Sequence, residues 1–410
     1  MIRRRALPLI AALAWVGGCD GCKKNPPVLE IAEASTTAAT APDASAPLPP
    51  RCEETKALPL DRDLVEYGEA LVTKSGVLVG AAYEKDGKRR AGIVTVAREG
   101  DAIGAARLDD AGELAADAPP PDVVLLGGKA IAATYPPSKD ARELAIDAWR
   151  IPQQKDDSFA FDVAVRESGD GLVAWDEDAP AGSSGARGIV KVAPLPFDPK
   201  APPIVASPES SDADSPRVAL RPGGYWVVWI AKKPEPEKDA APELEGPGER
   251  PHLAWLEIAA LDAKGSPAGA PLRVTKAGSR IESFDLAAQG DSLDVLVKDD
   301  EQPADGAGSR LVLVTVRGAE SQVRVVLESG AGRGVPDLLG ARIAFADLHD
   351  HVRLRPLAAG GRVSVEPALD GARPLAALGD QILAGFSGDP ARALRILRCP
   401  DPPEVRSGKQ

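Results

Sequence analysis

Three groups of side chains in this sequence have the chemistry to bind a metal ion. His349 and His351 are two of only three histidines, and on a strand they would share a face, so both imidazoles could reach one ion. Asp176 and Asp178 belong to an acidic run after Trp175, in an expected loop, and such oxygen ligands suit Ca²⁺. A further acidic run at 299–305 lacks the alternate-residue spacing of an EF-hand. Because polar turns and solvated loops have the same composition, we expect no resident cofactor, with Ca²⁺ as the exception these ligands would allow.

Common catalytic motifs are absent from the sequence. It has no Gly-x-Ser-x-Gly elbow, no His-Glu-x-x-His and no Walker loop. A Ser or Cys nucleophile needs a His base within reach, and only His252, His349 and His351 are available. This scarcity argues against catalysis by a Ser or Cys nucleophile.

The first 18 residues have the pattern of a secretory signal. Three arginines at 3–5 precede an apolar run at 6–16, which is shorter than the roughly 20 residues that span a bilayer. The next residues, Val16-Gly17-Gly18-Cys19, resemble the lipobox of bacterial lipoproteins, with Val16 where Leu is usual. The resemblance implies cleavage before Cys19 and acylation of that residue. It also implies attachment to the cell envelope, on the extracytoplasmic side of the inner or outer membrane.

Residues 19–51 and 401–410 are expected to be a linker and a tail around one large domain at 52–400. The linker is rich in Ala, Pro, Ser and Thr and lacks apolar periodicity. Loss of the arginines at 3–5 with the signal takes the formal charge from −12 to −15. Such an acidic chain argues against nucleic acid as a partner. The expected contacts are therefore the membrane, through the lipid, and a protein or glycan partner.

An internal repeat dominates residues 52–400. Seven times, an apolar stretch meets a Gly-containing turn and a second apolar stretch, and a third follows after a loop. The first two stretches of each repeat lie at 70–76 and 77–83, 123–128 and 130–135, 163–165 and 172–175, 218–220 and 225–229, 284–286 and 293–297, 338–340 and 343–345, and 375–379 and 382–386. Short β-prone segments split by Gly turns predict strands, and four strands in about 40–50 residues predict a propeller blade. The fold prediction is all-β, a propeller of seven four-stranded blades; the alternative is two β-sandwich domains.

The seventh repeat has three strands, so its fourth should come from the start of the domain, at 55–60. This closure would make Cys52 and Cys399 neighbours, and an exported chain permits the disulfide. By chain entropy such a link could stabilise the fold by on the order of 4–5 kcal/mol.

Two functions remain open from the sequence. The main prediction is a membrane-anchored binding or scaffold module that engages a partner through propeller loops, because nothing in the chain demands catalysis. A charged insert at 232–250 is either a surface loop or a docking segment. The alternative is a propeller enzyme acting on saccharide or cell-envelope material, which inward-facing carboxylates near the ring axis would favour.

Overall fold

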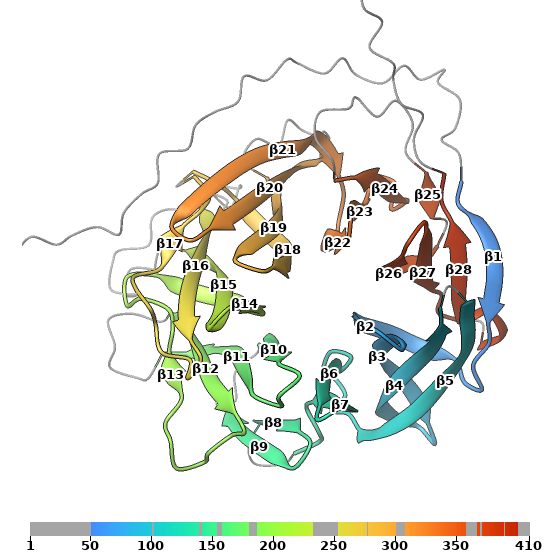
Figure 1. Cartoon of the computed structure of the whole chain (residues 1–410), viewed down its shortest axis with the longest axis horizontal. Helices are drawn as coiled ribbons and strands as arrows, with labels where there is room; N and C mark the ends of the chain where they lie inside the picture. Colours follow the sequence, from blue (N-terminus) through green and yellow to red (C-terminus); the bar gives the residue numbers. More distant parts are fainter. Residues whose placement is uncertain are drawn as a thin grey trace, which may run out of the picture.

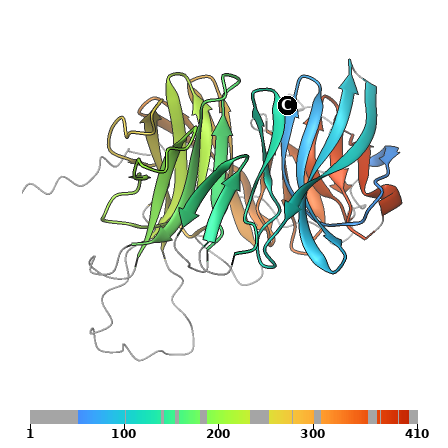
Figure 2. The ribbon, with the colours of Figure 1, turned by 90° about the horizontal axis from the view of Figure 1, so that it is seen from below.

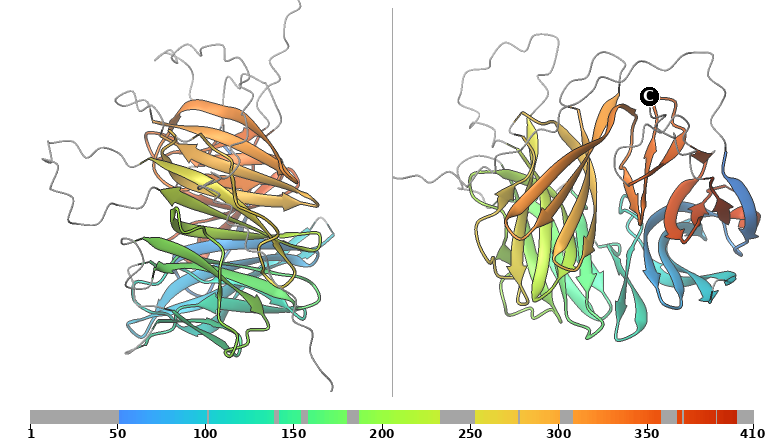
Figure 3. Two further views of the ribbon diagram at one scale, coloured as in Figure 1. Left: turned by 90° about the vertical axis from the view of Figure 1, so that its left-hand side faces the viewer. Right: turned by 45° about the horizontal axis from the view of Figure 1, so that its top comes forward.

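Seven four-stranded antiparallel sheets stand around a common axis and form a β-propeller (Figure 1). This computed structural model describes residues 51–400 except 101, 139–141, 154–157, 180–186, 233–252, 277, 301–307, 358–366, 370 and 389. Edge-on, the strands run through the thickness of the ring, and the sheets face one another around it (Figures 2 and 3). The propeller prediction is confirmed, and the two-sandwich alternative is wrong.

The strands follow one another from the axis outward in each blade. Blades one to three contain β2 (Leu64–Thr73), β3 (Gly76–Lys85), β4 (Lys88–Glu99) and β5 (Ala102–Glu113); β6 (Asp122–Leu126), β7 (Lys129–Thr134), β8 (Arg142–Ile146) and β9 (Trp149–Gln153); and β10 (Phe161–Val165), β11 (Gly171–Asp178), β12 (Gly188–Leu195) and β13 (Ile204–Val205).

Blades four to six contain β14 (Asp212–Arg221), β15 (Gly224–Lys232), β16 (Ala254–Asp262) and β17 (Leu272–Arg273); β18 (Ile281–Gln289), β19 (Ser292–Asp299), β20 (Ser309–Arg317) and β21 (Glu320–Ala331); and β22 (Asp337–Leu339), β23 (Arg342–Ala346), β24 (Val352–Pro356) and β25 (Ala368–Leu369). Blade seven contains β26 (Arg373–Leu378), β27 (Gln381–Gly385), β28 (Leu394–Arg398) and β1 (Glu53–Leu58), with the short helix η1 (Pro390–Arg392) before β28.

The second strand of a blade is buried on both faces, which explains its continuous apolar sequence. In β15, eight of nine residues are buried, because the sheet packs between two neighbouring blades. Tight turns precede these strands, and at Gly127 and Gly128 both φ angles are positive, at 56° and 80°. This conformation favours glycine over every residue that carries a Cβ atom.

The last blade is closed by the first strand of the domain. β1 pairs with β28 from Glu53 opposite Arg398 to Leu58 opposite Leu394, and Cys52 forms a disulfide with Cys399. The predicted mixed blade and the predicted disulfide are both confirmed. Among the residues that the structure describes, no helix is long and apolar enough to cross a membrane.

One face of the ring, here called the entry face, is where the innermost strands begin. The second strands end on the same face, since Asp212 at the start of β14 lies opposite Lys232 at the end of β15. The segments that link one blade to the next therefore reach the entry face, and they surround the point at which the inner strands approach the axis.

Candidate active site

The innermost strand of every blade contributes a charged residue to one cluster, here called the axial cluster. Its members come from blades one to seven in chain order: Glu69, Asp122, Asp162, Arg217, Asp285, Asp337 and Arg373. Five carboxylates and two guanidinium groups are thus gathered by seven strands far apart in sequence. No local motif contains more than one of them.

Two of the carboxylates fasten neighbouring blades together. Asp162 accepts hydrogen bonds from the backbone N–H of Val163 at 2.7 Å and of Val218, in the next blade, at 2.7 Å. Asp285 repeats the pattern, with Leu286 at 2.8 Å and Leu338, again in the next blade, at 2.6 Å. In Asp162 and in Asp285, each carboxylate oxygen accepts a hydrogen bond from the backbone. A structural role, the linking of two blades, therefore explains why these two carboxylates are present.

Arg217 connects opposite sides of the ring. Its guanidinium group forms an ion pair with Glu69, although their strands lie in blades four and one. Arg373 donates a hydrogen bond to the backbone carbonyl of Tyr67 in the adjoining blade. Burial lowers the pKa of Arg217, while the charges of Asp285 and Asp337 oppose that change.

Asp122 and Asp337 differ from the other aspartates of the cluster, because neither has a hydrogen bond to another described residue. Burial, with the nearby charge of Asp162, raises the pKa of Asp122 well above its ordinary value. Burial also raises the pKa of Asp337 to about 7; the charge of Asp285 adds to this effect, and Arg373 and Arg217 oppose it. The two carboxyl groups therefore sit in different electrostatic surroundings.

The pKa values of Asp162 and Asp285, the two carboxylates that link neighbouring blades, are also raised. Burial raises the pKa of Asp162 to about 7, against the opposing effect of its two backbone donors. It also raises the pKa of Asp285, which Arg217 opposes. Protein atoms enclose the cluster, yet water still reaches it, since Asp122, Asp285 and Asp337 are only half-buried. Protons can therefore exchange with solvent.

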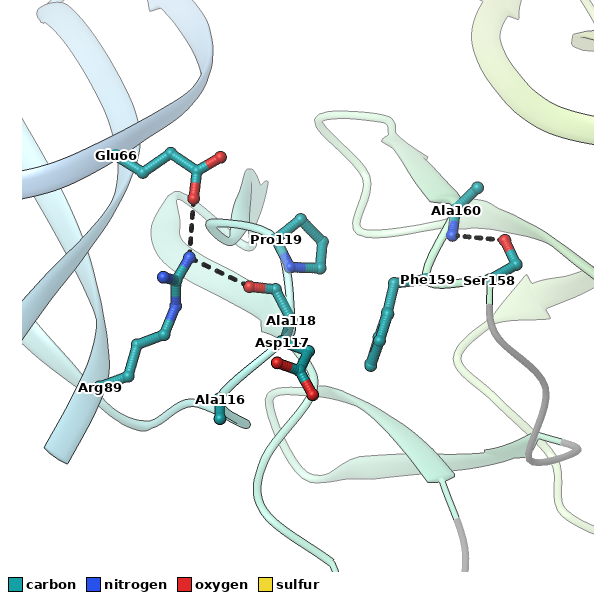
Figure 4. A pocket seen from close by; sticks show the side chains of 9 residues that line it. All are labelled: Glu66, Arg89, Ala116, Asp117, Ala118, Pro119, Ser158, Phe159 and Ala160. Atoms are coloured by element: carbon teal, nitrogen blue, oxygen red, sulfur yellow. Dashed lines mark hydrogen bonds and ion pairs between the residues drawn. The ribbon is translucent and has the colours of Figure 1, made fainter.

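A pocket on the entry face leads to Asp122 and Arg217. It has a volume of about 210 Å³, and Phe159, Pro119 and Ser215 also line it. A neighbouring pocket of about 690 Å³ is lined by Glu66, Arg89, Asp117 and Phe159, among others (Figure 4). A substrate bound at the entry face would thus have a path to Asp122.

The histidine pair lies in a turn on the entry face. Asp347 Oδ1 accepts hydrogen bonds from the backbone N–H groups of His349 at 2.8 Å and His351 at 3.0 Å. The two imidazole rings are 6.2 Å apart, and Arg353 takes the other oxygen of Asp347. The two residues lie in a turn and not on a strand, which corrects their predicted setting; a metal site there stays a prediction.

Asp176 and Asp178 end strand β11 and do not form a loop, which corrects their predicted setting. Asp176 is buried and accepts a hydrogen bond from the backbone of Ser215 at 2.9 Å, whereas Asp178 is exposed. In the acidic run that follows β19, Asp299 pairs with Arg310 at 2.7 Å. Within the described residues, no three His, Cys, Asp or Glu side chains are grouped to hold a metal ion.

Two sequence predictions lie outside the described residues. Cys19 precedes the first described residue, so its acylation stays a prediction. Of the charged insert, only Lys232 is described; it forms an ion pair with Asp214 at 2.5 Å.

The axial cluster was missed at the sequence level, although a signal for it exists. In six of the seven repeats a charged residue stands one or two positions before the first apolar stretch, as Asp122 does before Val123 and Asp337 before Leu338. In the fifth repeat Asp285 lies within the stretch itself. Only alignment of all seven repeats on one axis shows these residues as a set.

No family model matches the chain, and no curated protein matches it either. Solved structures that resemble it include an endo-arabinase from Bacteroides thetaiotaomicron, at 13% identity and a TM-score of 0.34 over 78% of this chain and 95% of that one. They also include an endo-arabinanase from Bacillus licheniformis, at 10% identity and a TM-score of 0.31 over 65% of this chain and 99% of that one. A third is an exo-β-1,3-galactanase from Phanerochaete chrysosporium, at 9% identity and a TM-score of 0.36 over 83% of this chain and 69% of that one.

The main functional prediction, a binding or scaffold module, is corrected by these matches. All three are named for activities on saccharides. At such identities the likeness shows the fold alone. The chemistry has to come from the chain's own residues.

Proposed function

We propose that this protein is a glycoside hydrolase whose reaction takes place at the axial cluster. The observation that carries the proposal is the convergence of five carboxylates from five blades, two of which, Asp122 and Asp337, are not committed to backbone donors. Glycosidic hydrolysis commonly uses one carboxylic acid as proton donor and a second carboxylate on the other side of the bond.

Asp122 is the proton donor in this proposal. Burial raises its pKa and so favours the protonated carboxyl group, and the residue lines the pocket that opens to the entry face. Its proton passes to the glycosidic oxygen as the bond from that oxygen to the anomeric carbon breaks. The sugar that leaves then departs as a neutral alcohol.

Asp337 is the partner carboxylate. Burial raises its pKa to about 7, and the charges of Arg373 and Arg217 act in the opposite direction. In its ionised form it can accept a proton from the water that attacks the anomeric carbon. Blades two and six lie on opposite sides of the axis (Figure 1). The proposed reaction is a single displacement, with water between the sugar and the base.

Hydrolysis of a panel of purified polysaccharides by the full mature chain tests the proposal, with reducing ends as the readout. Replacement of Asp122 or Asp337 by Asn should lower the rate by about 10²–10⁴-fold, the usual contribution of a general acid or base. Asp291→Asn is the matched control, because this exposed residue lies in the turn between β18 and β19, on the face of the ring opposite the entry face. Equal rates for the three variants on every cleaved substrate would refute the assignment.

The lipid anchor is part of the same proposal. Acylated Cys19 would hold the propeller at the extracytoplasmic membrane surface, and the Pro-rich segment at 20–51 would separate the two. The hydrolase would then meet saccharides of the cell envelope or its surroundings. Cys19→Ala should move the protein from the membrane fraction to the soluble fraction; unchanged fractionation would contradict the anchor.

A further inference from the structure

Three pockets of the entry face are continuous with one another and form what is here called the mouth groove. The pocket above Asp122 shares Phe159, Pro119 and Ala160 with the pocket of about 690 Å³. It shares Ser215 with a third pocket of about 450 Å³, which is lined by Asp214, Lys232 and Glu282, among others. The groove therefore crosses blades one to five.

Asp122 lines the smallest of the three pockets, here called the middle pocket because it shares residues with both larger ones, which also share Ser158 with each other. The two flanking pockets each fall within the volumes typical of small-molecule sites, about 300–1,000 Å³, whereas the middle one is smaller, at about 210 Å³. A ligand that reached Asp122 from one flank could continue into the other. This arrangement suits a chain better than a single sugar.

Phe159 stands between the middle pocket and the larger flank. Tyr135 meets its ring edge-on, with centroids 5.2 Å apart, and the guanidinium of Arg142 lies 4.0 Å from its centroid. Figure 4 shows Phe159 and Ser158 on one side of the flank and Glu66 and Arg89 on the other. The ring is held by its neighbours and half-buried, as an apolar surface against a sugar requires.

Each cation that lines the mouth groove already has a carboxylate partner. Arg89 pairs with Glu66 at 2.7 Å and Lys232 with Asp214 at 2.5 Å, and Arg217 pairs with Glu69. Asp117 and Asp122 line the groove without such an ion pair. Among the described residues of the groove, an anionic chain would therefore find surplus negative charge and no uncommitted cation.

We infer that the mouth groove binds a linear chain of neutral or amino-bearing sugars across the ring axis, and that the chain is cut internally. The inference rests on the proposed hydrolase, since the cut takes place at Asp122. It adds the mode of attack, the exclusion of anionic chains and a binding surface at Phe159. None of these follows from the axial carboxylates alone.

The products released first from neutral polysaccharides distinguish internal cleavage from release of terminal units. The protein should yield fragments of several sugars, and kcat/KM should rise with chain length beyond three sugars. Polygalacturonate, as the anionic chain, should be cleaved at least tenfold more slowly. Initial release of single sugars from one end, or equal cleavage of polygalacturonate, would overturn the inference while leaving a hydrolase in place.

Phe159→Ala tests the binding surface, with Phe386→Ala as the matched control. The ring of Phe386 also lies beneath a guanidinium group, that of Arg395 at 3.6 Å, but it lines none of the three pockets. Loss of an aromatic surface should lower kcat/KM on long chains by roughly three- to tenfold in Phe159→Ala. Equal losses in the two variants would show a packing effect only and would count against the groove.

Binding can be tested separately from hydrolysis with the Asp122→Asn variant, by electrophoresis through gels that contain a neutral polysaccharide or chitosan. Retardation that disappears when Phe159 is also replaced supports the groove even where no hydrolysis is found, an outcome that would reject only the proposed function. Unretarded migration in every gel would reject the groove.

Discussion

At the scale of single residues, Asp162 and Asp285 show why carboxylates belong near the axis of this ring. Neighbouring inner strands do not pair with each other, so the N–H groups on the free edge of each inner strand would lack partners. Each aspartate supplies one oxygen to its own strand and one to the next blade. The charge–dipole contacts fix the angle at which blades three and four, and five and six, meet.

Asp285→Ala should therefore lower the free energy of unfolding by about 2–4 kcal/mol, since two backbone donors lose a charged acceptor. Asp285→Asn should cost less, because its amide oxygen can still accept one of the bonds. Urea unfolding of both variants, with Asp291→Ala as the control, measures the loss in the free energy of unfolding. An Asp285→Ala protein as stable as the control would mean that the contact between blades needs no such link.

The roles of these residues were hidden from sequence reasoning for a physical reason. A sequence displays local clusters, such as Asp176 with Asp178 and His349 with His351, but neighbours in sequence need not converge in space. The axial carboxylates come one from each blade, and only the curvature of the complete ring brings them together.

At the scale of elements, the contact between blades one and two fixes the position of Asp122. A Cβ atom on Gly80 in β3 would overlap the carbonyl oxygen of Pro121, and one on Gly68 in β2 would come within 2.6 Å of the same oxygen. Two glycines thus let the chain before Asp122 approach blade one closely. The position of the proposed acid depends on this lack of side chains.

Gly80→Ala should displace Pro121, lower the free energy of unfolding by about 1–3 kcal/mol through overpacking, and reduce hydrolysis through its effect on Asp122. Gly269→Ala is a suitable control, since a Cβ there meets no atom within 4 Å. Thermal unfolding and the hydrolysis rate are the measurements. If both variants resembled the parent protein, the close approach would have no bearing on the site.

Strand positions were foreseeable where glycine turns separate apolar runs, and less so where another residue makes the turn. The stretch at 144–149 reads as one strand, yet it contains the end of β8, a turn and the start of β9. The turn includes Asp147, with φ at 50°. Asp can adopt that conformation through its short polar side chain. A turn of this kind contains no glycine, so the pattern of apolar residues alone does not indicate it.

At the scale of the whole molecule, ring closure was predictable from the sequence because one repeat lacked a strand and a cysteine lay at each end. The disulfide joins residues 347 positions apart, and it connects the two ends of the domain beside the β1–β28 pair. Opening of the ring between β1 and β28 must break both this bond and the strand pair.

Cys52→Ser with Cys399→Ser should lower the free energy of unfolding by about 2–5 kcal/mol, the usual effect of losing a native disulfide. Thermal unfolding of the parent protein with and without a reductant gives the same comparison without mutation. The double variant itself should not respond to the reductant. A parent protein whose unfolding temperature did not change on reduction would show that the strand pair alone closes the ring.

The most direct test of the proposed chemistry is the pH dependence of kcat/KM for two glycosides that differ in their leaving group. The parent protein should give a bell-shaped profile on an unactivated oligosaccharide. Its rate falls below pH about 7, where Asp337 becomes protonated, and at higher pH, where Asp122 loses its proton. In Asp122→Asn the alkaline decline should vanish, with a loss of about 10²–10⁴-fold on the oligosaccharide and little loss on a dinitrophenyl glycoside, which needs no acid. Equal losses on both substrates, or an unchanged profile, would contradict Asp122 as the proton donor.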